Sequence, residues 1–270
     1  MSGRTILRVA RAVFKESVRD RVLYNLVGFA ILLIGASYLI GQLTAGQDVK
    51  IIKDLGLAAM SVFGLFIAIF IGIGLVSKEV ERRSVYSLLA KPVRRSELVV
   101  GKYAGLVLTV AVNLAVMTVV YYGVLAYMGW IETEEFRRGW EAPAADPRLL
   151  VAIFLVFVQL ALVIAIALFF STFSTPMLSA AFTFGLFIAG HFGADLKNFD
   201  IVVGDSPVRY VTTGLYYLLP DMAVFDVKTA VVHAQPVAAS YVAMTTGYGV
   251  LYAAALVAAA VLIFSRRDFK

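Results

Sequence analysis

The sequence predicts an all-α membrane protein with six transmembrane helices, an N-terminal helix on the membrane surface and a short cytoplasmic helix between the second and third spans. Of its 270 residues, 61% are hydrophobic and only 16% are charged, whereas soluble domains are about 45–50% apolar and about 25% charged. Long runs without charge recur at lengths near 20 residues, which is the length that crosses a bilayer. Lys and Arg gather between alternate runs, as they do in proteins that span a membrane repeatedly.

Residues 4–21 predict an amphipathic helix that lies along the membrane surface. Five basic residues follow one another at intervals of three or four, which places them on one helical face: Arg4, Arg8, Arg11, Lys15 and Arg19. Apolar residues fill much of the remainder. We expect the basic face to bind anionic lipid head groups. The alternative is a solvated charged stretch that only sets the topology.

Six apolar runs predict the transmembrane helices: Leu23–Leu43, Leu57–Val76, Tyr103–Met128, Leu149–Phe170, Met177–Phe192 and Tyr241–Phe264. None of them contains Lys, Arg, Asp or Glu, which argues against an ion-coupled secondary transporter. The fifth run is short, and the long loop 194–240 that follows it has apolar pieces. This region therefore has the character of a broken or re-entrant element.

The charges predict the orientation. With the N-terminus inside, 16 of the 24 Lys and Arg residues lie on the inner side and 12 of the 18 acidic residues on the outer side. This bias follows the positive-inside rule. Residues 1–270 are then one transmembrane domain in a bacterial or archaeal inner membrane, with both termini in the cytoplasm. The net charge of +6 is explained by this topology, so we expect no nucleic-acid partner.

The sequence shows no site for chemistry. It has no cysteine and only two histidines, so we expect no metal site. It also lacks the glycine-rich phosphate loop of ATPases and any triad-like pattern, so we expect no bound cofactor and no enzymatic activity. Asn113 and Gln159 are polar residues within predicted spans. They either contact a substrate in a translocation path or join helices by hydrogen bonds. His191 is expected near the outer interface.

The most informative segment is the charged loop Ser77–Lys102 between spans two and three. Residues 79–90 predict a short amphipathic helix, which Pro92 ends. Ser96 is expected to cap the next helix, with Glu97 near its positive end. Such a helix has the form of a lever for a cytosolic partner, but an ordinary loop that only fixes topology would also carry these bases.

The order of residues in this loop resembles the first cytoplasmic loop of ABC-2 type permeases, the membrane subunits of ABC transporters. The matching residues are Glu79, Glu81, Arg83, Ser84, Leu88, Leu89, Pro92, Val93, Arg95, Glu97, Gly101 and Lys102. The Arg83–Ser84 pair departs from the usual Gly-Thr. It is closer to the branch for multi-copper enzyme maturation, which includes the nitrous-oxide-reductase maturation permease. The run Tyr216–Pro220 also resembles that branch.

This resemblance implies a fold like that of type V exporters and a mechanism driven from outside the chain. Two copies of an ABC ATP-binding subunit would bind ATP and Mg, and the loop would be a coupling helix docked on them. The contact residues would be Glu79, Glu81, Arg82, Arg83, Leu88, Leu89, Pro92, Arg94, Arg95 and Glu97. A second permease copy or a homologue would complete a dimer, and membrane lipids and accessory periplasmic subunits are further expected partners.

Two other interpretations are compatible with the sequence. In the first, the chain is a non-transporting membrane anchor or assembly subunit of a larger complex. In the second, it is a channel or carrier that works without ATP. The sequence does not name a substrate.

Overall fold

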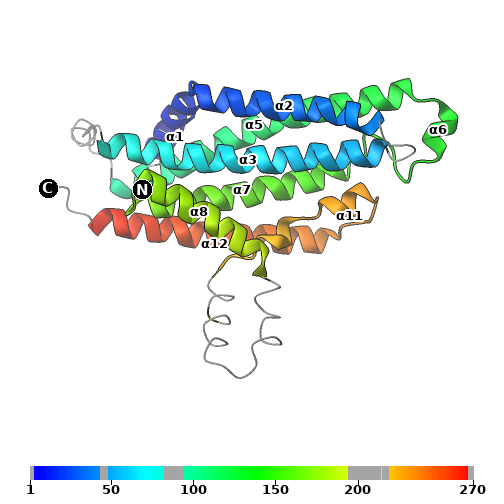
Figure 1. Ribbon diagram of the computed structural model, residues 1–270. Coiled ribbons are helices and arrows are strands. Elements are labelled where there is room, and N and C mark those ends of the chain that lie inside the picture. The colour runs from blue at the N-terminus through cyan, green and yellow to red at the C-terminus, as the bar shows by residue number, and fades with distance from the viewer. Residues whose placement is uncertain (1–2, 43–47, 82–93, 194–213, 215–218, 267–270) are drawn as a thin grey trace.

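The computed structural model describes residues 3–42, 48–81, 94–193, 214 and 219–266, and within this part of the chain the regular structure is helical. Figure 1 shows a bundle of long helices that run side by side. The elements are α1 (Gly3–Ser17), α2 (Arg21–Gln42), α3 (Asp48–Glu81), α5 (Arg95–Ile131), α6 (Glu134–Arg138), α7 (Leu149–Ser171), α8 (Pro176–His191), the 3₁₀ turn η1 (Ala223–Phe225), α11 (Lys228–Val232) and α12 (Ala239–Arg266).

Five helices of the described residues are long and apolar enough to cross a membrane: α2, α3 within Val49–Ile73, α5, α7 and α12. The chain is therefore a multi-pass membrane protein. One end of the bundle carries α1, the first turn of α5 and the last turn of α12, and is called here the α1 end. The opposite end carries α6 and α11 and is called the α6 end. The start of α1 and the last turn of α12 both lie at the α1 end (Figure 1).

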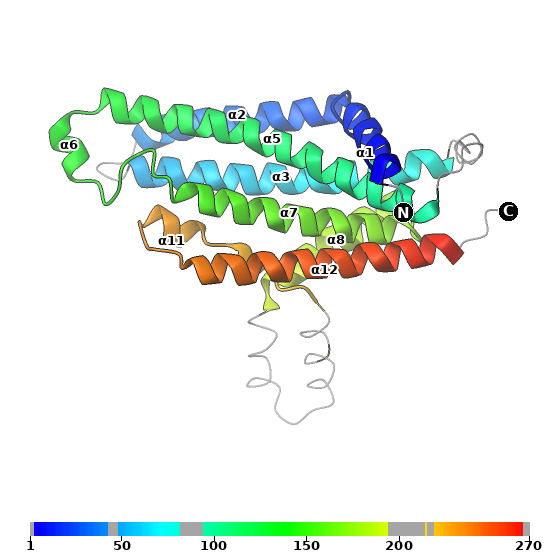
Figure 2. The same ribbon diagram turned by 180° about the vertical axis from the view of Figure 1, so that it is seen from behind.

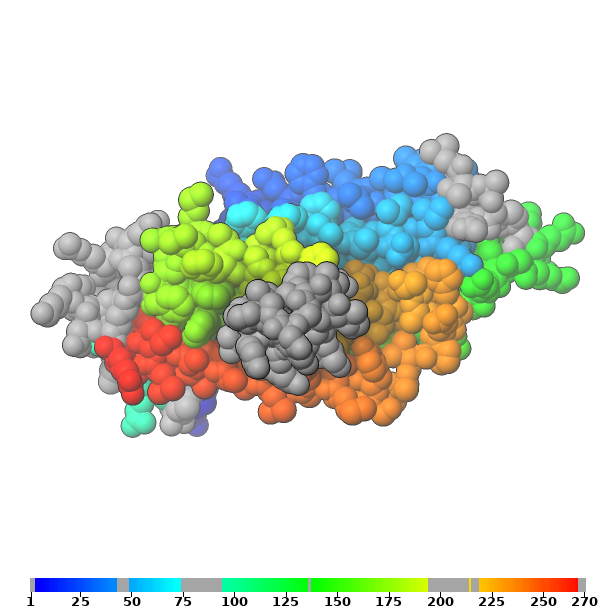
Figure 3. Space-filling view, turned by 60° about the horizontal axis from the view of Figure 1, so that its bottom comes forward, coloured from blue at the N-terminus to red at the C-terminus, as the bar shows by residue number. Residues whose placement is uncertain are grey.

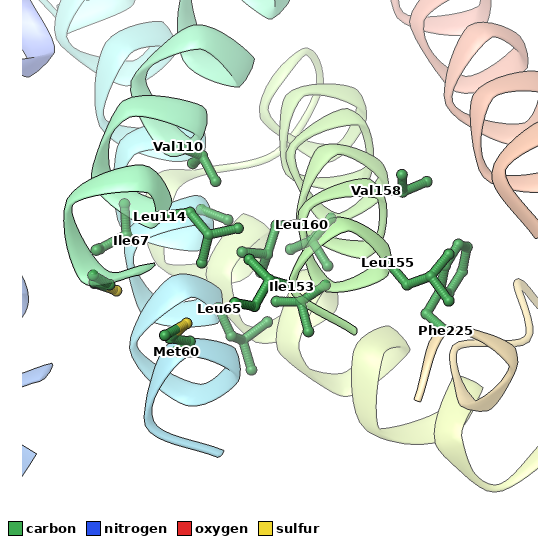
Figure 4. Packing of buried hydrophobic residues seen from close by; sticks show 14 of the residues in the cluster. Met60, Leu65, Ile67, Val110, Leu114, Ile153, Leu155, Val158, Leu160 and Phe225 are labelled. Carbon is green, nitrogen blue, oxygen red and sulfur yellow. The ribbon is translucent and has the colours of Figure 1, made fainter. Parts of the chain in front are cut away.

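Helix α7 forms the centre of the bundle. It is the most apolar of the five candidate spans and is largely buried, because α3, α5, α8 and α12 all pack against it. Figure 4 shows this core, in which side chains of α3 and α5 interdigitate with those of α7: Met60, Leu65, Ile67, Val110, Leu114, Ile153, Leu155, Val158 and Leu160, with Phe225 from η1. Helix association in lipid depends on such van der Waals contact and on small residues that allow close approach. At Gly64, for example, a Cβ would lie 2.5 Å from Cδ1 of Leu160.

Two helices extend well beyond the predicted spans. Helix α3 has 34 residues and α5 has 37, which correspond to lengths of about 51 and 56 Å at 1.5 Å per residue. The hydrocarbon core is about 30 Å thick. The predicted spans Leu57–Val76 and Tyr103–Met128 lie inside these helices and hold no charged residue, and the charged residues of α3 and α5 lie beyond the spans, towards the helix ends. Apolarity marks the part within lipid, but a helix continues past it wherever its charged residues find partners.

Helix α8 differs from the other candidates. It has 16 residues, or about 24 Å, and is shorter than the hydrocarbon core. It covers the part of one face nearer the α1 end, and the residues around α11 cover the part nearer the α6 end (Figure 3). The backbone N–H of Met222 donates to the carbonyl of Gly190 at 2.9 Å, which joins these two parts. The fifth predicted span is thus a helix that ends at His191, and a different segment completes the bundle.

Candidate functional site

The charged loop is flanked by two helices that the structure describes. Helix α3 runs without a break to Glu81, so the predicted helix over 79–90 begins as a continuation of α3, with Glu79 in its last turn. Arg94 precedes α5, and Arg95 and Glu97 lie in its first turn. The other predicted contact residues fall in 82–93, outside the described residues: Arg82, Arg83, Leu88, Leu89 and Pro92.

The first turn of α5 differs from the prediction at its cap. Arg94 is the N-cap, with an extended backbone and no side-chain capping bond. Ser96 lies inside the helix, so its predicted role as the cap is wrong, because the helix starts two residues earlier than expected. The position of Glu97 in the first turn is confirmed. Its side chain is only 4% exposed, and the positive end of the helix dipole stabilises a carboxylate there.

Arg95 connects the two helices that meet at the α1 end. Its guanidinium Nη1 donates to the carbonyl of Ser265 at 3.1 Å and lies 3.4 Å from that of Phe264. Carbonyls in the last turn of a helix have no partner within the helix, and a cation is favoured there. Arg95 therefore fastens the start of α5 to the end of α12. The sequence placed it among the contact residues, and the structure directs its guanidinium towards this chain's own α12.

Helix α1 packs across the first turns of α5. A Cβ at Gly101 would lie 2.7 Å from Cβ of Val9, and a Cβ at Gly105 would lie 2.7 Å from the carbonyl oxygen of Ala10. Two glycines four residues apart give α5 a flat surface on which another helix comes close. This contact buries Val13 and Ala10 of α1. The apolar face of the predicted surface helix thus packs on α5 over part of its area.

The basic face of α1 points away from this contact. Its four basic residues are exposed, as the helical spacing predicted: Arg4, Arg8, Arg11 and Lys15. Arg19, the fifth basic residue of the predicted helix, is also exposed but lies in the turn after α1, which ends at Ser17. The α1 end therefore combines a positively charged surface with a helix that is fastened to α5.

Gln159 lies in a buried polar cluster within the bundle. Its Nε2 donates to the carbonyl of Met222 at 3.0 Å and lies 3.3 Å from Nε2 of His191. Since the Met222 carbonyl can only accept, the amide nitrogen of Gln159 must face this way, and Nε2 of His191 acts as the acceptor. The proton of the neutral imidazole then sits on Nδ1, which donates to the carbonyl of Phe187 at 2.9 Å.

This cluster joins α7, α8 and the segment before η1, so Gln159 links elements by hydrogen bonds. Asn113 has a different position: its Nδ2 donates to the carbonyl of Thr109, one turn earlier in its own helix. The two residues proposed for a translocation path are both buried, at 8% and 4% exposure for Asn113 and Gln159, and they make separate contacts. The pairing of Gln159 with His191 was missed, because only the folded structure brings these positions together.

A second polar cluster lies at the α6 end, where the acidic loop 132–146 meets α3. Lys50 forms an ion pair with Glu141 at 2.6 Å. Lys53 is 2% exposed and donates to the carbonyl of Pro143 at 2.8 Å. The hydroxyl of Tyr121 in turn donates to the backbone carbonyl of Lys53 at 2.9 Å. Glu141 therefore pairs with α3.

Among the residues that the structure describes, no three His, Cys, Asp or Glu side chains are grouped to hold a metal ion.

The chain was also compared with known proteins and protein families. No curated protein matches the chain significantly. Residues 7–269 match the family model of the ABC-2 family transporter proteins. This match covers nearly the whole chain, including most of α1 and every other helix described above, and the chain therefore belongs to the ABC-2 family of transporter proteins.

Proposed function

We propose that this chain is the membrane-spanning permease subunit of an ATP-driven ABC transporter. Membership in the ABC-2 family implies partnership with an ABC ATP-binding subunit. The sequence has no phosphate-binding loop of its own. ATP and Mg are then bound by the partner, this chain carries out no chemistry, and ATP hydrolysis in the partner drives translocation or export through the membrane part.

The observation that carries the proposal is the convergence of helices at the α1 end. Segment 82–93 lies between α3 and α5, α5 is bonded to α12 through Arg95, and α1 packs on Gly101 and Gly105. A partner that pushed on this segment would therefore move α3, α5, α1 and α12 together. The α6 end has no comparable loop among the described residues, because its acidic loop is held by Lys50 and Lys53.

The predicted contact residues divide into two groups. We assign docking to the segment that includes Glu79, Glu81, Arg82, Arg83, Leu88, Leu89, Pro92 and the exposed Arg94. Arg95 and Glu97 face the inside of this chain or are buried in it. They would set the position of α5 and so transmit a displacement without touching the partner.

The remaining assembly follows from the family resemblance and the distribution of charge. The α1 end, where basic residues gather, faces the cytoplasm of a bacterial or archaeal cell. Two permease chains, identical or related, form the translocation unit and bind two ATP-binding subunits through two coupling helices. Arg83–Ser84 and Tyr216–Pro220 favour the branch for multi-copper enzyme maturation. The substrate is not named by these features.

Co-purification with the ATP-binding subunit tests the proposal. We expect the chain to form a complex whose ATPase activity exceeds that of the isolated subunit. Leu88→Asp and Arg94→Glu should reduce this stimulation, because each places an acidic group in the docking surface. A well-packed interface residue contributes about 2 kcal/mol, or a loss of about 30-fold in affinity.

Arg138→Glu is the matched control, since Arg138 lies at the α6 end and its side chain is 82% exposed. It should leave the stimulation unchanged. A stable complex with no stimulation of ATPase activity would favour the membrane anchor instead. Transport that continues without any ATP-binding subunit would favour the channel or carrier.

A further inference from the structure

We infer that a groove formed by α5, α7 and α12 binds one anionic phospholipid from the leaflet at the α1 end. The groove has a volume of about 750 Å³. Figure 2 shows these three helices side by side on one face of the bundle. Each of them is a candidate membrane span, so the groove lies at the depth of the lipid tails. This inference rests on the membrane location of the bundle and does not require the ATP-binding subunit.

The lining of the groove suits an acyl chain. It is apolar apart from Ser96 and Tyr103, and the Tyr103 hydroxyl donates to the carbonyl of Ala161 at 3.3 Å. The exposed residues Ala254 and Ala258 leave the groove open to the side, because a methyl group fills little of the space beside α7. A polar ligand would find few partners inside, whereas a hydrocarbon chain would lose no hydrogen bond on entry.

The length of the groove matches one leaflet. Along α12 it extends from Leu262 to Gly249, and along α5 from Ser96 to Val107, which are about 20 and 16 Å at 1.5 Å per residue. Half of the hydrocarbon core is about 15 Å. A chain that entered from the α1 end would therefore reach approximately to the middle of the bilayer.

The mouth of the groove is positively charged. Exposed Arg94 precedes Ser96 by two residues, and exposed Arg266 lies four residues beyond Leu262, on the same face of α12. Arg95 bridges the two helices there through the carbonyl of Ser265. Both exposed arginines thus lie at the α1 end of helices that form the groove, and Arg is well suited to bind phosphate. Charge and length together select a phospholipid with an anionic head group.

Native mass spectrometry of the full chain in detergent tests this inference, with phosphatidylglycerol and phosphatidylcholine added in parallel. We expect the wild-type chain to retain one phosphatidylglycerol per copy. The concentration of phosphatidylglycerol needed for this should be on the order of tenfold lower than that of phosphatidylcholine, since each basic group at a membrane surface favours anionic lipid. The double variant Arg94→Gln/Arg266→Gln should abolish this preference but still bind lipid, because the groove itself is unchanged.

Ala254→Trp and Ala258→Trp should abolish retention of both lipids by filling the groove. Leu251→Trp is the matched control on α12, since Leu251 is 73% exposed and does not line the groove. Equal retention in wild type and Ala258→Trp would overturn the inference. Equal binding of the two lipids by the wild type would also overturn it. If the wild-type chain retained no lipid and Ala258→Trp changed its oligomeric state, the groove would instead be assigned to a second copy of the chain.

Discussion

The guanidinium of Arg95 donates a hydrogen bond to the carbonyl of Ser265 over 3.1 Å, and so joins residues 170 positions apart in the chain. The bond holds the first turn of α5 against the last turn of α12. It therefore links α12 directly to α5, the helix that follows the charged loop. A residue that the family resemblance assigned to the partner interface thus bonds to another helix of its own chain.

Arg95→Gln should loosen the end of α12. Hydrogen bonds to charged groups contribute about 1.5–3 kcal/mol, so we expect a lower unfolding midpoint and faster amide exchange around Ser265. Arg94→Gln is the control, since Arg94 is exposed and its side chain makes no capping bond. Equal exchange rates in the two variants would show that the Arg95 bond does not hold α12.

Gly105→Ala should separate α1 from α5. The added Cβ would lie 2.7 Å from the carbonyl oxygen of Ala10, so one helix must move. Overpacking of this kind costs about 1–3 kcal/mol. Gly123→Ala in the same helix meets no atom within 4 Å and should be neutral or slightly stabilising. Hydrogen exchange over α1 measures the difference, and no change in Gly105→Ala would contradict the observed packing.

Gln159→Leu should destabilise the contact among α7, α8 and the segment around Met222. It removes both donated bonds and leaves the Met222 carbonyl and Nε2 of His191 without them, at a cost of about 1–3 kcal/mol. Asn113→Leu should cost less, because it breaks only a bond within one helix. Thermal unfolding of both variants in detergent provides the comparison, and a larger loss for Asn113→Leu would refute the assignment.

The Lys50–Glu141 pair should give a small pH dependence at the α6 end. The hydrogen bond from Lys50 lowers the pKa of Glu141, with desolvation acting in the opposite sense. A lowered pKa in the folded state stabilises the fold above the unfolded value of about 4.3 and loses this contribution as the pH falls through the folded value. The difference in unfolding midpoint between wild type and Glu141→Gln should therefore shrink as the pH falls from about 7 to about 3. A difference in unfolding midpoint that widens as the pH falls would contradict a stabilising ion pair between Lys50 and Glu141.

Four helices coincide closely with apolar runs of the sequence. The bounds of α2, α7, α8 and α12 lie within two residues of those runs, because each apolar run is bordered by charged or loop-forming residues. Lys50 and Lys53 were left outside the second span because they interrupt its apolar run. The helix nevertheless includes them, since Glu141 and the carbonyl of Pro143 serve as their partners.

The site was only partly predictable. The loop motif marked Arg95 and Glu97, and the spacing of basic residues marked the exposed face of α1. The direction in which Arg95 points depends on where α12 ends, which no local pattern shows. Similarly, the contact of Gln159 with His191 depends on how α7 and α8 pack against each other, which the pattern of neither helix shows.

Site-specific crosslinking tests the central claim most directly. The chain has no cysteine, so a single cysteine carrying a photoreactive group can be placed at Arg94 or, as a control, at Arg138. With the ATP-binding subunit co-expressed, Arg94→Cys should yield a covalent adduct with that subunit, in an amount that changes when ATP is added, and Arg138→Cys should yield none. An adduct from Arg138→Cys alone, or none from Arg94→Cys in an intact complex, would contradict docking at the α1 end.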